Sequence, residues 1–177
     1  MNRYNIFYQI HKGLREMLYN TASLLQQTDF TDKDEATTVL NQVEETLFLF
    51  DKHAHTEDHF ILPAITRHEP STAALFEEEH IQDHDLGNRM RSLLLIFHSC
   101  EIEQEQVIAA GAIRIAFIDF MIFNLQHMAK EEGILFPAMQ QWTGGELDAP
   151  TMELRQEHDS QGALLRLMES LTDDFTP

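Results

Sequence analysis

Residues 53–64 read HAHTEDHFILPA, and residues 127–138 read HMAKEEGILFPA. Both stretches follow the pattern H-x-x-x-E-[D/E]-x-x-[I/L]-[L/F]-P-A, with histidine, glutamate and proline each offset by 74 residues (127 − 53, 131 − 57 and 137 − 63). An offset that holds at three positions indicates an internal repeat. Because residues four apart lie on one face of an α-helix, each histidine points the same way as the glutamate that follows it.

Apolar residues at helical spacing place both His–Glu pairs on the buried side of their helices. These residues are Val43, Leu47, Phe50 and Phe60 around the first pair, and Ile113, Phe117, Phe120 and Ile134 around the second. A carboxylate in an apolar interior is costly unless it is paired, protonated or bound to a metal. Since imidazoles and carboxylates are both metal ligands, the repeat predicts a metal site that includes His53, Glu57, His127 and Glu131.

The rest of the chain is also typical of helices, because glycine and proline number only 7 and 5 among 177 residues. Apolar periodicity predicts five helical segments, at about residues 4–27, 31–63, 71–100, 103–141 and 150–173. Short connections favour antiparallel neighbours. We therefore expect one all-α domain over residues 1–177, an up-and-down antiparallel four-helix bundle at about 4–141 with an additional C-terminal helix.

Single histidines on the other helices complete the candidate site. His11 lies on the apolar face of the first segment, and the third segment carries His80 and His84 on one face. The offsets of 73 from His11 to His84 and 74 from His84 to His158 favour His84 as the ligand, with His80 as a second ligand or a neighbour of one. His158, on the fifth segment, is an alternative to His11; we favour His11 because its helix is long and apolar.

The types of ligand limit the choice of metal. Imidazole and carboxylate suit iron, manganese or zinc. Cys100 is the only cysteine, which excludes an internal disulfide and a cysteine-bound iron–sulfur cluster within one chain. Two glutamates that span two metals, with about two histidines on each, leave coordination positions open for O2, NO, peroxide or water.

Charge and hydropathy limit the choice of partners. A net charge of −18 repels nucleic-acid phosphates and anionic lipids, so we expect no nucleic-acid partner. The sequence has no uncharged apolar run of 18 residues, and its N-terminus does not resemble a signal peptide. We expect a cytoplasmic protein that does not enter a membrane, and a homodimer stays open.

Taken together, these motifs resemble the hemerythrin-like, or HHE, cation-binding family. The matching stretches are IHKGLR at residues 10–15, His53-x-x-x-Glu57, Glu79-His80 with His84, and His127-x-x-x-Glu131 up to Pro137. The resemblance implies a four-helix bundle with a non-haem diiron centre bridged by both glutamates. Its implied iron ligands are His11, His53, Glu57, His84, His127 and Glu131. Oxygen-carrying hemerythrins use His-x-x-x-His on the third helix, which adds His80.

The C-terminal part is similar to the diiron domain of the iron–sulfur cluster repair proteins. The similar stretches are residues 127–137, 157–165 and 171–172. That family's further His-x-x-x-Glu helix and N-terminal cysteine-bearing region have no counterpart in these 177 residues. Our first expectation is therefore a protein that binds or senses O2, NO or peroxide at two iron ions, with zinc or manganese as substitutes. The alternatives are a cluster-repair, iron-donor or oxidase-type protein, and a metal- or oxygen-responsive regulatory module.

Overall fold

The computed structural model describes residues 6–141, and the predicted fifth helix with His158 lies outside the described residues. The described elements are α1 (Ile6–Gln27), α2 (Lys33–Thr56), η1 (Glu57–Ile61), α3 (Leu62–His68), α4 (Pro70–Ser99), α5 (Glu103–Lys130), η2 (Glu131–Leu135) and α6 (Phe136–Gln141). All of them are helical, which confirms the all-α class.

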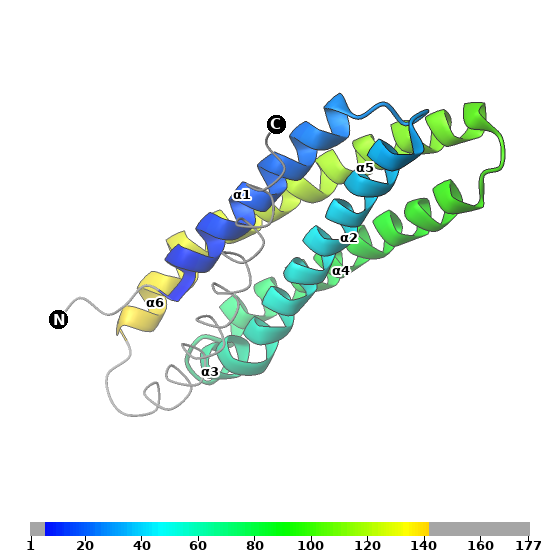
Figure 1. Ribbon diagram of the computed structural model, residues 1–177. Helices are drawn as coiled ribbons and strands as arrows, with labels where there is room; N and C mark the ends of the chain where they lie inside the picture. The colour runs from blue at the N-terminus through cyan, green and yellow to red at the C-terminus, as the bar shows by residue number, and fades with distance from the viewer. Residues whose placement is uncertain (1–5, 142–177) are drawn as a thin grey trace.

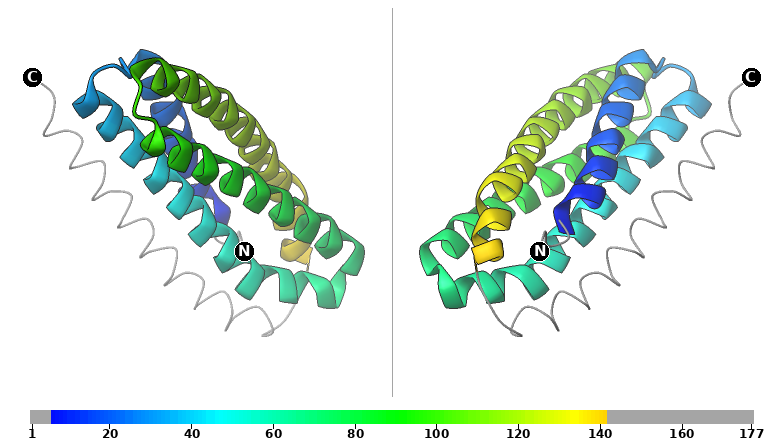
Figure 2. Two further views of the ribbon diagram at one scale, coloured as in Figure 1. Left: turned by 90° about the vertical axis from the view of Figure 1, so that its right-hand side faces the viewer. Right: turned by 90° about the vertical axis from the view of Figure 1, so that its left-hand side faces the viewer.

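The long helices α1, α2, α4 and α5 lie side by side, and successive ones run in opposite directions (Figure 1). Figures 1 and 2 show that α3 and α6 lie at the same end of the bundle, where α3 turns away from the line of α2. The connections explain this arrangement, because residues 28–32 and 100–102 are too few to let a helix cross the bundle.

Each copy of the repeat contains a short π-helical turn, η1 or η2, that begins at the repeat's glutamate. The backbone N–H of Leu62 bonds to the carbonyl of Glu57, and that of Phe136 bonds to the carbonyl of Glu131, five residues back in both cases. A proline follows each of these residues. Because the turn is already widened, a residue without an N–H is tolerated there, and the helix continues past Pro63 to His68.

The interior of the bundle has two apolar clusters. The larger cluster includes Leu14, Leu47, Met90 and Phe117, and the smaller one includes Phe7, Ile61, Phe76 and Leu135. On α1, Phe7 belongs to the smaller cluster and Leu14 to the larger one, so His11 lies between them. The histidines and glutamates of the repeat therefore form a polar layer between two apolar layers.

By length and composition alone, the helical stretch Glu103–Met139 could cross a membrane, because it contains an 18-residue window with a mean hydropathy of 1.8. The search of the sequence for an uncharged apolar run of 18 residues did not find this stretch, because the stretch contains charged residues. The central helix of a bundle passes the same test. This stretch supplies Phe117, Phe120, His127 and Glu131 to the buried interior.

Candidate metal centre

Six of the seven predicted ligands lie together in the polar layer. Their ligand atoms form two groups, His11, His53, Glu57 and Glu131 on one side and Glu57, His80, His127 and Glu131 on the other. Within each group the atoms lie within 4.8 Å of one another. All six residues are buried, with exposed fractions from 0% for His11 to 7% for His80. Both glutamates belong to both groups.

Each glutamate divides its two oxygens between the groups. Glu57 places Oε1 3.2 Å from Nε2 of His53 and Oε2 3.4 Å from Nε2 of His80. Glu131 places Oε2 3.3 Å from Nε2 of His11 and Oε1 3.2 Å from Nε2 of His127. The Nε2 atoms face each other in pairs, at 3.1 Å for His11 with His53 and at 3.2 Å for His80 with His127. The ligand atoms thus form two groups that share both carboxylates.

The two glutamates cannot both ionise easily without a cation. Burial, followed by the charge of Glu131, raises the pKa of Glu57 well above its usual value. Burial also acts to raise the pKa of Glu131, but the neighbouring imidazoles of His11 and His127 outweigh it and hold that pKa well below its usual value. Within the described part of the chain, all four oxygens of these carboxylates are buried without a hydrogen bond of good geometry. Acidic oxygens in this state fit a bound cation.

A second set of acids, which the sequence analysis missed, surrounds the imidazoles. The Nδ1 atoms of His11, His80 and His127 each contact a carboxylate, from Glu132 at 3.0 Å, Asp58 at 2.6 Å and Glu79 at 2.9 Å. Lys130 also contacts Glu79. Two of the three acids could have been found in the repeat itself, since Asp58 and Glu132 are its [D/E] position.

The structure places His80, and not His84, in the cluster. The buried row on α4 consists of Ala73, Phe76, His80, Asp83, Gly87, Met90, Leu94 and Phe97, spaced by three and four residues. His84 follows Asp83 directly, about 100° further around the helix, and its side chain is exposed. The buried heptad row was the signal that could have identified His80.

The offset argument for His84 failed because the helices of the two halves differ in length, with 22 and 24 residues in α1 and α2 but 30 and 28 in α4 and α5. His11 and His53 are separated by 42 residues, whereas the corresponding His80 and His127 are separated by 47. An offset taken from the His-x-x-x-Glu helices therefore does not carry over to their partner helices.

Asp83, also on the buried row, accepts a 2.6 Å hydrogen bond from Nδ2 of Asn124, and burial raises the pKa of Asp83.

Comparison with known proteins agrees with this site. A family model described as the hemerythrin HHE cation binding domain matches residues 88–177, half of the chain. The chain belongs to this family. The match contains the second repeat, with His127 and Glu131. Family membership and the two His–Glu groups together support metal binding.

Several curated proteins similar to this chain are iron-sulfur cluster repair proteins named YtfE. The chain is 46% identical to that of Dickeya chrysanthemi (strain Ech1591) over 52 residues, which is 29% of this chain and 24% of the relative. It is 44% identical to that of Musicola paradisiaca (strain Ech703) over 52 residues, 29% of this chain and 23% of the relative. The chain thus matches about a quarter of the length of these relatives.

His80→Ala and His84→Ala should separate the two candidate ligands on α4. Loss of His80 should weaken zinc binding by more than about tenfold, because a direct ligand contributes more than a supporting residue. Loss of the exposed His84 should leave the affinity within about twofold of the unaltered protein. Calorimetric titration of metal-free protein measures both, and equal losses in the two variants would contradict the geometry.

The metal-free protein should lose stability as the pH rises. Burial acts to lower the pKa of His127, but hydrogen bonds and charges of Glu131 and Glu79 outweigh it and raise the pKa from 6.5 to about 9. The protonated form therefore stabilises the fold fully below pH 6.5, and this contribution, at most about 3 kcal/mol, is lost as the pH rises to 9. The raised pKa of Glu57 acts in the same direction.

Urea unfolding of metal-free protein at several pH values tests this dependence. His127→Gln should flatten the decline between pH 6.5 and 9, whereas the exposed His84→Gln should preserve it. Stability that rises over this interval in the unaltered protein would show that His127 is not held in its charged form.

Proposed function

We propose that this protein holds two non-haem iron ions, bridged by Glu57 and Glu131, and uses them to bind or sense O2, NO or peroxide. The observation that carries the proposal is the division of each carboxylate between the two groups of ligand atoms. A carboxylate that serves a single metal does not need its second oxygen directed at another pair of imidazoles.

The donor set suits iron and leaves room for a ligand. Each group contains two imidazoles and two shared carboxylates, which are four ligand atoms, whereas iron commonly accepts more. When bound, iron supplies open coordination positions and a change of oxidation state. Zinc or manganese could replace iron at the same atoms.

A surface cavity of about 350 Å³ borders the group that contains His80. Its lining consists of Asp51, Ala54, His55, Asp58, His80, Asp83 and His84. This cavity offers a small molecule an approach to the His80 side of the layer. The two apolar clusters lie above and below the layer.

Protein purified without oxygen and loaded with Fe(II) should contain about two irons per chain, since both groups share their bridging ligands. Exposure to O2 or NO should produce new absorption in the near-ultraviolet or visible range, measured by optical spectroscopy. Glu57→Ala and Glu131→Ala should both lose iron, whereas Glu45→Ala, which alters an exposed glutamate on α2, is the control and should keep it. One tightly bound zinc and no optical response would overturn the proposal.

A second candidate is an iron donor in iron–sulfur cluster repair. It is favoured by the repair proteins of Dickeya and Musicola, to which the chain is similar over 52 residues. The exposed cavity beside His80 is also consistent with the release of a metal ion.

This candidate predicts that iron-loaded protein restores activity to an iron–sulfur enzyme damaged by NO or peroxide. The rate should exceed that of an equal concentration of free Fe(II), because the iron is delivered from a defined site. The control is protein reconstituted with zinc, which keeps the fold but supplies no iron. Recovery that is equal with the iron-loaded and zinc-loaded forms would exclude iron donation.

A further inference from the structure

Each bridging glutamate is followed directly by an acidic residue that has no part in the proposed bridge. Asp58 follows Glu57, Glu132 follows Glu131, and the two acids are offset by 74 residues (132 − 58). Neither acid belongs to the two groups of ligand atoms. Adjacent residues on a helix point about 100° apart, so an acid beside an inward glutamate is directed sideways, toward a neighbouring helix.

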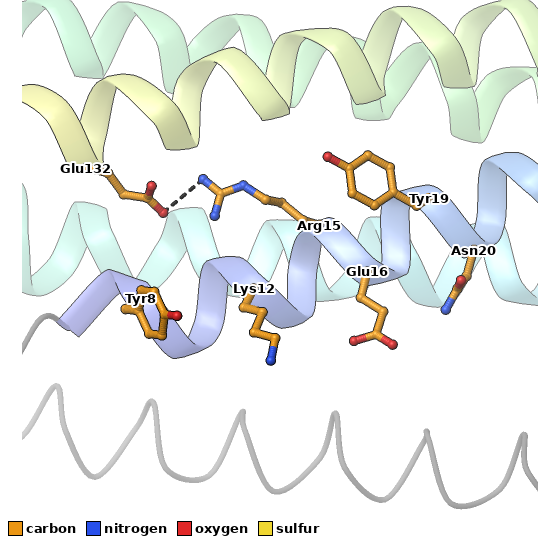
Figure 3. A pocket seen from close by; sticks show the side chains of 7 residues that line it. All are labelled: Tyr8, Lys12, Arg15, Glu16, Tyr19, Asn20 and Glu132. Carbon is orange, nitrogen blue, oxygen red and sulfur yellow. Dashed lines mark hydrogen bonds and ion pairs between the residues drawn. The ribbon is translucent and has the colours of Figure 1, made fainter.

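Glu132 reaches from η2 to α1, where its Oε1 lies 3.0 Å from Nδ1 of His11. The same oxygen accepts a 2.9 Å hydrogen bond from Nη2 of Arg15, one turn further along α1. Figure 3 shows this guanidinium directed across the gap toward Glu132, at the edge of a surface cavity. Arg15, Glu132 and His11 thus form a chain of contacts from the surface to the polar layer.

Asp58 makes the corresponding contact on the other side of the bundle. Its Oδ1 lies 2.6 Å from Nδ1 of His80, which comes from α4. In both contacts the acid belongs to one copy of the repeat and the histidine to a helix of the other half of the chain. The two contacts are therefore reciprocal, as expected for a duplicated unit.

The contact at Nδ1 determines what Nε2 can do. A neutral imidazole carries one N–H, and a carboxylate at Nδ1 retains the proton there as a donated hydrogen bond. Nε2 is then left with a lone pair. In His11 this atom lies 3.3 Å from Oε2 of Glu131, and in His80 it lies 3.4 Å from Oε2 of Glu57, so both lone pairs face the cluster.

We propose that Asp58 and Glu132 are positioning residues of the metal centre. Each holds the imidazole of the facing half in the tautomer and orientation that presents Nε2 to the metal. The pattern H-x-x-x-E-[D/E] is then one functional unit. Its glutamate bridges the metals, and the acid that follows orients a histidine ligand from the other half of the chain. This inference rests on the proposed metal site.

The two acids differ in their exposure and in their other contacts. The side chain of Glu132 is 32% exposed and is paired with Arg15, whereas that of Asp58 is 52% exposed and lines the cavity beside His84. An ion pair limits the rotamers of the acid that holds His11. The contact to His11 is thus the more rigid of the two, and Arg15 acts on the metal only through Glu132.

Asp58→Asn and Glu132→Gln are the variants of choice, because an amide of the same shape can either accept from Nδ1 or donate to it and no longer fixes the tautomer. In each variant the metal affinity should fall by about tenfold, the usual effect of losing a supporting hydrogen bond to a ligand. The controls are Asp85→Asn, an exposed aspartate on α4, and Glu16→Gln, which lines the cavity of Figure 3. Zinc and Co(II) are the probes, used with the full chain.

Three measurements separate a positioning role from a structural one. Zinc release to a chelator should be faster by about tenfold in both variants and unchanged in both controls. The visible bands of the Co(II) form should shift in the variants, because they report ligand orientation. Urea unfolding of the metal-free variants should match the metal-free unaltered protein within the usual effect of a surface substitution.

Arg15→Gln extends the test. It should accelerate zinc release in the unaltered background but add little in the Glu132→Gln background, since both residues act through one contact. If the unaltered protein binds neither zinc nor Co(II), the proposed function itself fails. If it binds them and the amide variants release metal no faster than the controls, the metal site stands and the positioning role is overturned.

Discussion

Glu57 and Glu131 lie together in a buried layer, and the burial of two neighbouring carboxylates constrains the helices around them. Two such charges cannot persist in an apolar interior without cations or protons. The pKa values of the two carboxyls shift in opposite directions, because burial and the charge of Glu131 raise that of Glu57 while the imidazoles of His11 and His127 lower that of Glu131. Metal ions remove this conflict, so the fold and the site depend on the same pair of residues.

The apolar clusters on either side keep this polar layer fixed. Side chains such as Phe50 and Phe120 pack edge to face on one side, while Phe7 packs against Phe136 on the other. Close packing allows few alternative positions for the imidazoles between them. The π-helical turns belong to the same arrangement, because each begins at Glu57 or Glu131 and changes the phase of the helix just beyond it.

The sequence predicted those parts of the site that depend on spacing within one helix better than those that depend on contacts between helices. Spacing of four residues within one helix is a local property, so His53 with Glu57 and His127 with Glu131 could be placed on one face without knowledge of the fold. The choice between His80 and His84 depended on how two different helices align, and the unequal lengths of the helices in the two halves decide that. The offset pointed to His84, whereas the buried row on α4 identifies His80. The role of the acids at Nδ1 was missed because the sequence does not show which helix each acid faces, although Asp58 and Glu132 both occupy the [D/E] position of the repeat.

The duplication also explains why the halves of the chain depend on each other. The first group takes both histidines from α1 and α2, and the second takes both from α4 and α5. Each glutamate, however, directs one oxygen at the other half, as Glu57 does toward His80 and Glu131 toward His11. The acids that follow them make the same exchange. A metal position built from one half alone would have two imidazoles but only one of its two carboxylates, and one of its imidazoles would lack its orienting acid. A site that requires four helices in register thus links metal binding to the assembly of the whole bundle.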